Sequence, residues 1–400
     1  MASYVLLPRC GLSQFNPVTL ENVYLYSMKS ALNYRYWQYL FGVGFLWTMC
    51  VHPASAQSFR NAKYGGDFLS LGAGARGLAM GEAQGAVVHD GTSPFWNVAG
   101  LSQIDTPETI WMRSERFGGI LSRDYVAFAY PIEEGRVFAI SWLRQGVNGV
   151  QNTLNAWDPD RQSPIANASG AITTFNVSDQ ALFLSYGQPL DRSWFGATWS
   201  TGASIKWISH TVGPFANAWG TGLDAAIQGT SEQWSMGLHV NDLFSMLKFW
   251  RYDAEELAPL ETVYGDVLPS STKESVRPSA RLSVARSQSL GEFSLQVVGD
   301  VVVHVENRQA YNLNLGGMSF EPYLGFELTA WTWAHLRWGL SDLVLPQEGS
   351  ATWTPAVGLG IETTRVVLDY AFTDFSGYAS DLGVTHRISL KVAIPELRKR

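Results

Sequence analysis

The sequence is short of cysteine and of charge. Its 400 residues include two cysteines, Cys10 and Cys50, and only 16% of the residues are charged. An average soluble domain carries roughly 25% charged residues, so this chain has too few for a water-facing surface of its size. Both cysteines lie in an N-terminal segment that we expect to be removed. The mature chain is therefore predicted to have no disulfide, no thiolate nucleophile and no cysteine metal ligand.

The chain also lacks a basic surface and the motifs of common enzymes. Its net charge is −7, which argues against nucleic acid as a partner, because phosphate binding needs a basic face. It contains no G-x-S-x-G, no H-E-x-x-H and no P-loop, and its histidines are scattered without ligand spacing. We therefore expect a protein that is not an enzyme, with no catalytic residues, no cofactor and no metal.

Long apolar runs are missing as well. The one notable run, residues 40–51, has about 12 residues where a membrane-spanning helix needs roughly 20. It follows Met28 and a few basic residues, and small residues at Ala54 and Ala56 come after it. This order is typical of a Sec signal peptide cleaved after Ala56. We interpret residues 1–56 as a leader, with Met28 as the preferred start, and predict export to a Gram-negative outer membrane.

From residue 108 onward the side chains alternate with period 2. In residues 195–207, "FGATWSTGASIKW", the aromatic and aliphatic side chains share one face and the small or polar ones share the other. A soluble sandwich also alternates, but here charged residues occupy the polar face and aromatic residues tend to end the apolar stripes, which is typical of a transmembrane β-barrel. The polar residues that we expect to face the lumen are Lys206, Arg281, Asp300, Arg337, Arg365, Asp369 and Arg387.

Two long interruptions break the series of strands. Residues 145–177 are rich in polar and turn-forming residues, and we assign them to an extracellular loop. The second interruption is residues 242–277. Within it, residues 242–257, "DLFSMLKFWRYDAEEL", resemble an amphipathic helix that would pack on the barrel rim, lie on the membrane surface or dock a partner. The rest predicts about 14 strands of roughly ten residues each, the length that a tilted strand needs to cross a bilayer.

A glycine-rich stretch precedes the strands. Gly72, Gly74 and Gly77 spell G-x-G-x-x-G, and Asp90 follows at about the distance of a ribose-binding acid. A dinucleotide-binding fold needs a helix of ten or more residues after the glycines. Only residues 78–84 separate Gly77 from the next apolar run. The helix does not fit, so we reject a nucleotide site.

Residues 68–101 resemble the N-terminal signature of the PorV/PorQ-type outer-membrane proteins, relatives of the FadL-like barrels. In that signature an L-x-x-G-x-x-A-R segment leads through Met-Gly and an aspartate to W-N-P-A-G-L, and Val98 stands here in place of the proline. The C-terminal residues 366–390 resemble the closing hairpin of the same family. The motif residues that we single out are Gly72, Gly74, Arg76, Met80, Gly81, Asp90, Trp96, Asn97 and Gly100.

This resemblance implies an all-β protein, a transmembrane antiparallel β-barrel of about 14 strands with an N-terminal hatch inside its lumen. It divides the chain into the leader, a hatch at residues 57–106, a barrel at residues 107–394 and a basic tail at residues 395–400. Within the lumen we expect Arg76 and Asp90 to pair with interior charges and anchor the hatch, because unpaired charges there would be costly.

Two functions remain open. The family resemblance favours a non-enzymatic component associated with type IX secretion, which would dock secreted cargo or help to attach it at the cell surface. Its partners would be outer-membrane lipids, type IX secretion components and secreted cargo proteins. The alternative is a FadL-like channel that admits hydrophobic small molecules through a lateral opening past the hatch. A channel predicts an apolar pocket behind the hatch and an opening in the wall, whereas a docking barrel predicts a plugged polar lumen.

Overall fold

The computed structural model describes residues 59–158, 160–161, 163–264, 272–308, 313–344, 351–376 and 380–395. The predicted leader and residues 396–400 of the predicted tail lie outside this range. Within it, no helix has both the length and the apolar character that a membrane-crossing helix requires.

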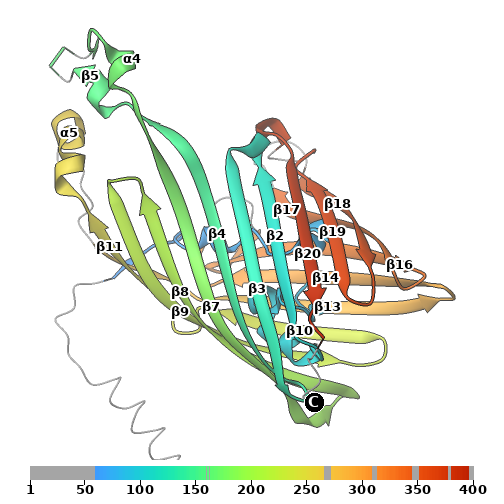
Figure 1. The fold of residues 1–400 in the computed structure, drawn as a ribbon. Helices are drawn as coiled ribbons and strands as arrows, with labels where there is room; N and C mark the ends of the chain where they lie inside the picture. The colour runs from blue at the N-terminus through green and yellow to red at the C-terminus, as the bar shows by residue number, and fades with distance from the viewer. Residues whose placement is uncertain are drawn as a thin grey trace, which may run out of the picture. The chain divides into compact units, whose positions relative to one another are not determined.

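The chain from Glu108 to Ala393 forms a closed antiparallel β-barrel of 14 strands (Figure 1). Strand β20 pairs with β2 and closes the wall. Two of the 14 strands consist of two segments each. One is made of β10 and β11, which both pair with β9. The other is made of β12, which pairs with β11, and β13, which pairs with β10. The barrel strands are β2 (Glu108–Arg116), β3 (Leu121–Glu133), β4 (Arg136–Asn152), β7 (Thr173–Trp194), β8 (Ala197–Val212), β9 (Ala216–Thr230), β10 (Trp234–Asn241), β11 (Met246–Tyr252), β12 (Lys273–Val276), β13 (Ser279–Leu290), β14 (Phe293–His304), β16 (Met318–Ala330), β17 (Ala334–Val344), β18 (Thr352–Glu362), β19 (Val366–Thr373) and β20 (Thr385–Ala393).

The alternation along each strand separates a lipid-facing surface from the lumen. On β8, Ile205 and Trp207 are 47% and 44% exposed, whereas Lys206 between them is 1% exposed. Successive side chains of a strand point to opposite faces, so Lys206 points into the lumen and its neighbours point outward. An outer surface covered with exposed aliphatic and aromatic side chains suits a lipid environment and would be a liability in water. The barrel is therefore of the outer-membrane type.

The two ends of the barrel differ in their connections. The chain enters β2 and leaves β20 at the same end, where Glu108 pairs with Ala393. Short turns such as Phe195–Gly196 lie at this end, and the long connections, residues 153–172 and 253–272, lie at the other. Outer-membrane barrels have short periplasmic turns and long extracellular loops, so the second end is the extracellular one.

Some strands extend far beyond what a bilayer requires. Strand β7 has 22 residues, whereas β20 has 9. Strands β4, β7 and β8 rise toward the extracellular end, where the short elements of the long loops lie (Figure 1). These short elements are η3 (Phe117–Gly119), η4 (Leu154–Ala156), β5 (Trp157–Asp158), β6 (Ser163–Pro164), α4 (Ala168–Ala171), α5 (Ala254–Tyr264), β15 (Leu313–Leu315) and η5 (Ser380–Leu382).

Three sequence expectations differ from the structure. Part of the loop predicted at residues 145–177 is strand, because β4 continues to Asn152 and β7 begins at Thr173. The two strands pair with each other on both sides of a bulge. The predicted helix at residues 242–257 begins only at Ala254, since residues 246–252 pair with β9 as strand β11. Arg365 does not face the lumen: it lies exposed in the turn between β18 and β19.

The N-terminal segment from residue 59 to 106 lies inside the barrel as a hatch. It contains β1 (Arg60–Asn61), η1 (Asp67–Leu69), α2 (Ala75–Ala79), α3 (Ser93–Trp96) and η2 (Val98–Gln103). Its apolar side chains pack on inward-facing wall residues, as Phe68 and Ala73 do with Met112, Tyr125 and Leu143. The hatch thereby supplies the core that the lumen of a 14-stranded barrel would otherwise lack.

Leu359→Arg should test the lipid-facing assignment. Leu359 lies within β18 and is 60% exposed, so the substitution places a charge against hydrocarbon. We expect the free energy of unfolding to fall by about 2–4 kcal/mol, measured by urea titration in lipid vesicles. Thr363→Arg in the adjoining turn is the control and should have little effect. Equal stability of the two variants would contradict the assignment.

Candidate functional site

The hatch lies backbone to backbone against the barrel wall at several places, one of which is the turn after α2. Gly81 has a φ of +59°, and a Cβ atom there would collide with the backbone of Leu340. Gly325 and Gly339, which pair with each other on β16 and β17, lie equally close to the backbone of Met80. Glycine at these three positions lets the turn after α2 lie directly on the wall.

Strands β16 and β17 stop pairing immediately beside this contact. Their register runs from Ala330↔Ala334 to Leu324↔Leu340 and ends there. Farther toward the extracellular end, β17 pairs with β18 through a register shift and β16 pairs with β15. No described strand pairs with residues 321–323 on the β17 side of β16. This unpaired stretch, which we call the seam, is about 10 Å long at 3.3 Å per residue.

Two backbone features fit the seam. Pro322 lies in it and has no N–H group to donate to a neighbouring strand. Across from it, Asp342 has a φ of +47°, an uncommon conformation for a residue other than glycine. It lies within the register shift between β17 and β18, where β17 departs from regular pairing.

A cavity of about 410 Å³ lies above the hatch, at the extracellular end. We call it the outer chamber. It has aromatic and aliphatic walls with charged residues among them. Its lining residues are Tyr64, Asp67, Phe68, Ser70, Leu71, Glu82, Arg116, Phe117, Gln145, Arg308, Glu321, Pro322, Tyr323, Asp342, Leu343, Thr354 and Leu382.

The outer chamber extends into the wall at the seam. Tyr323 is buried and faces the lumen, so its neighbour Pro322 points to the outer face of the strand. Both residues nevertheless line the same cavity, together with Leu343 on β17. The cavity therefore reaches the wall at the place where the two strands do not pair.

Most charged groups of the outer chamber are paired. Arg308 contacts Asp67 at 3.0 Å, His304 contacts Glu321 at 3.2 Å, and Arg116 contacts Asp374 at 3.4 Å. Glu82 differs, since none of the described residues forms a side-chain hydrogen bond or ion pair with it. Burial, together with the nearby charge of Asp342, raises the pKa of Glu82 to about 7.

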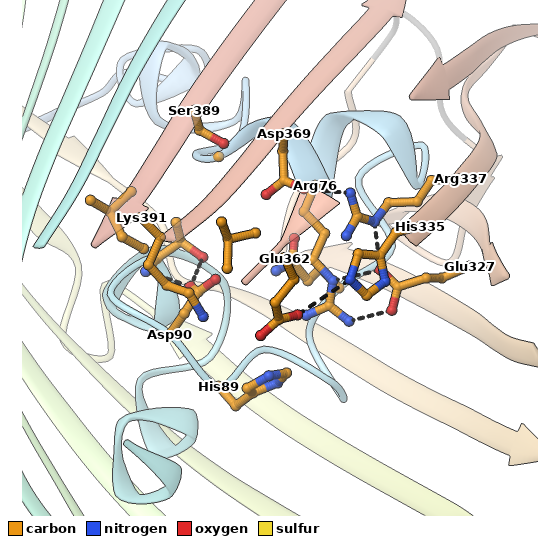
Figure 2. A pocket seen from close by; sticks show the side chains of 15 residues that line it. Arg76, His89, Asp90, Glu327, His335, Arg337, Glu362, Asp369, Ser389 and Lys391 are labelled. Carbon is orange, nitrogen blue, oxygen red and sulfur yellow. Dashed lines mark hydrogen bonds and ion pairs between the residues drawn. The ribbon is translucent and has the colours of Figure 1, made fainter. Parts of the chain in front are cut away.

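A second, smaller cavity of about 110 Å³ lies on the periplasmic side of the hatch, and we call it the inner chamber (Figure 2). Charged groups dominate it. Glu327 on β16 lies between Arg76 of the hatch, at 2.9 Å, and Arg337 of β17, at 2.5 Å, and Arg337 also contacts Asp369 at 2.6 Å. His335 contacts Glu362 at 3.2 Å. Its remaining lining residues are Gly74, Gln84, His89, Asp90, Thr92, Ile110, Val367, Ser389 and Lys391.

Arg76 anchors the hatch to the wall as predicted, whereas the hydrogen bonds of Asp90 stay within the hatch and it forms no ion pair among the described residues. Arg76 forms two hydrogen bonds to the Glu327 carboxylate, at 2.9 and 3.0 Å, and so ties α2 to the wall. Asp90 instead accepts from the backbone and the hydroxyl of Thr92, at 2.8 and 2.5 Å. Burial would raise the pKa of Asp90, but the Lys391 ammonium and the Thr92 hydrogen bonds outweigh it and hold the pKa below its ordinary value.

Two fully buried arginines of the wall bind the hatch through its carbonyl groups. Arg123 donates to the carbonyl of Gly72 at 3.1 Å, and Arg387 donates to that of Leu71 at 2.9 Å. Neither arginine has an ion pair among the described residues. Carbonyl groups thus take the place that carboxylates usually have around a buried guanidinium.

The other motif residues lie within the hatch and fix its internal shape. The buried indole of Trp96 donates to the carbonyl of Ala73 at 2.7 Å. Asn97 caps η2 by accepting from the backbone of Ala99 at 3.2 Å. Gly74 donates to the sulfur of Met112 at 3.0 Å, and Gly100 lies against the carbonyl of Val88. The motif is therefore structural around Trp96, and within residues 68–101 the outer chamber touches Phe68, Ser70, Leu71 and Glu82.

The polar residues predicted to face the lumen, Arg365 excepted, are buried inside the barrel. Lys206 lies between Asp224 and Asp242, at 2.8 Å from each, and Arg281 contacts Asp300 at 2.9 Å. Arg337 and Asp369 belong to the inner chamber. Arg387 binds carbonyl groups of the hatch and the others form separate ion pairs, so the structure does not gather them into one site.

Sequence reasoning did not single out several residues that matter here. Glu82 lies within residues 68–101, directly after Gly81, and both residues have a positive φ. The alternating pattern does predict the position of Glu327, because it places this residue on the polar face of its strand, opposite Arg337. The seam has Pro322 as its only local signal. The described residues contain no group of three or more side chains that could hold a metal ion.

Among known proteins, only solved structures resemble this chain, and they resemble it in fold. No family model and no curated protein matches the sequence. Among solved structures, the chain is similar to the CymD monoaromatic hydrocarbon channel, with a TM-score of 0.48 and 10% identity over 81% of this chain and 98% of that chain. It is similar to the P. putida toluene transporter TodX, with a TM-score of 0.47 and 11% identity over 81% and 99%.

A Pseudomonas aeruginosa FadL homologue gives a TM-score of 0.44 and 12% identity over 80% of this chain and 98% of that chain. These similar structures are FadL-like barrels, and at such identities the likeness concerns the fold alone. The PorV/PorQ resemblance of the motif gains no support from these comparisons.

Gly81→Val should disturb the hatch where it contacts the seam. The valine would need a strained backbone conformation and would collide with Leu340, so we expect the hatch to block the barrel less completely and ion conductance across planar bilayers to rise. Gly118→Val is the matched control, because Gly118 has a similar φ of +63° but open space around it. The expectation fails if both variants conduct like the parent protein.

Glu82→Gln should change how stability depends on pH. Because the folded protein raises the pKa of Glu82 from 4.5 to about 7, the stability that the protonated group provides is complete below about pH 4.5 and is lost as the pH rises through 7. The variant should therefore gain roughly 1–3 kcal/mol over the parent at pH 8 and nothing at pH 4.5, measured by urea unfolding. Glu133→Gln, an exposed control, should show the same difference at both pH values.

Proposed function

We propose that this protein is a non-enzymatic outer-membrane channel for hydrophobic small molecules. The observation that carries the proposal is the continuity of the outer chamber with the seam between β16 and β17. The outer chamber combines apolar walls, among them Phe68, Leu71 and Leu343, with polar groups, and sites for small hydrophobic ligands also combine the two. Such a molecule would enter from the extracellular end and rest on Phe68 and Leu71 of the hatch.

The charges of the inner chamber disfavour a straight path to the periplasm. An apolar molecule in that chamber would have to separate Arg76, Glu327 and Arg337 without replacing their interactions, and unpaired buried charges are costly. The seam instead leads past Pro322 and Leu343 toward the lipid. Transfer of the molecule from extracellular water to lipid is downhill overall, because each Å² of apolar surface moved from water to lipid contributes about 25 cal/mol.

Leu343→Trp tests this route by placing a larger side chain at the seam. We expect the rate of 1-methylnaphthalene uptake by cells that contain the protein to fall at least about threefold. Leu336→Trp on the same strand, whose side chain faces outward away from the cavity, is the matched control and should leave uptake unchanged. Equal uptake by parent, variant and cells without the protein would refute the channel.

A docking role in type IX secretion is the second candidate. The length of β4 and β7, with 17 and 22 residues, favours it, because these strands carry loops well beyond the bilayer toward the extracellular side. Deleting the gene should then reduce the surface display of secreted proteins, whereas Leu343→Trp should not. Normal surface display in the deletion strain would leave the channel as the better account.

A further inference from the structure

The outer chamber contains two carboxylates whose capacity to accept hydrogen bonds is largely unused. The one acceptor contact of Asp342 among the described side chains is a hydrogen bond of 3.1 Å from the hydroxyl of Ser341. Glu82 accepts none from any described residue. The other charged residues that line the chamber have the partners described above. The chamber therefore offers acceptors to a ligand, and each of its cations already contacts a carboxylate.

The backbone holds Glu82 in place from both sides. Its N–H donates to the carbonyl of Gly77 at 2.8 Å, and its own carbonyl accepts from Arg281 at 2.9 Å. Its φ is +65°, a conformation that costs about 1–3 kcal/mol in a residue that is not glycine. Glu82 follows Gly81 directly, so its carboxylate belongs to the part of the hatch that touches the wall beside the seam.

We propose that Glu82 and Asp342 bind the cationic or hydrogen-bond-donating head of an amphipathic ligand, an amine or an alcohol, whose apolar part occupies the rest of the outer chamber. This inference rests on the proposed channel function and deepens it by naming the ligand class. Phe68, Phe117 and Tyr323 supply apolar walls for the tail, and aromatic faces also attract cations.

The same geometry disfavours ligands with an acidic head. A carboxylate that entered the chamber would meet Glu82 and Asp342, and like charges at short distance repel in a partly desolvated site. The cations that could compensate are already bound to acidic partners, as Arg308 is to Asp67. Hydrocarbons without a head would fit the walls but leave the carboxylates unsatisfied.

The test uses four probes that share one ring system: 1-naphthylmethylamine, 1-naphthalenemethanol, 1-methylnaphthalene and 1-naphthoate. Binding to the full protein in nanodiscs is measured by calorimetry at pH 8, and empty nanodiscs correct for partitioning into lipid. We expect the amine to bind at least about tenfold more tightly than 1-methylnaphthalene, the alcohol to lie between them, and 1-naphthoate to bind most weakly. A charge-assisted hydrogen bond accounts for a difference of this size.

Glu82→Gln should lower the ratio of amine affinity to 1-methylnaphthalene affinity about tenfold, and Glu133→Gln should leave the ratio unchanged. Heat-modifiable migration on a gel shows that both variants are folded. An amine that binds no better than 1-methylnaphthalene, or a ratio that Glu82→Gln does not alter, would overturn the head-group assignment while leaving the channel intact. If none of the four probes binds, the channel function itself fails.

Discussion

The hatch lies directly on the barrel wall at Gly81, and the proposed lateral route depends on this contact. Three glycines, one on the hatch and two on the wall, let the backbones meet without side chains between them. The pairing of β16 and β17 ends beside this contact. The hatch therefore separates an outer from an inner chamber, and its turn lies where the wall becomes unpaired.

The two chambers differ in polarity for a physical reason. Arg76 ties the hatch to Glu327, and Arg337 and Asp369 extend the ion-pair network on the periplasmic side. Such a network is favourable only while every member stays paired, so it resists the entry of apolar molecules. The outer chamber has aromatic and aliphatic walls and leads to the seam. In the channel that we propose, passage sideways into the lipid therefore costs less than passage through the hatch.

Much of the barrel could be predicted from the sequence because alternation is a local pattern. It identified the lipid-facing side of β8 and the lumen position of Lys206, and the glycine-rich motif marked the hatch. It assigned Arg365 to the wrong environment, because alternation continues into a turn without a change in sequence. The seam and the unpartnered Glu82 depend on which strands pair and where they separate, and the pattern of a single strand does not contain that information.

Photolabelling with a small apolar diazirine, 3-trifluoromethyl-3-phenyldiazirine, tests the central claim most directly, because mass spectrometry identifies the residues that carry the label. A hatch that diverts apolar molecules sideways predicts labels on Phe117, Tyr323 and Leu343, which excess 1-methylnaphthalene should suppress. Labels on His89 and His335 of the inner chamber, with none at Leu343, would contradict the account. They would show that apolar molecules cross the hatch toward the periplasm.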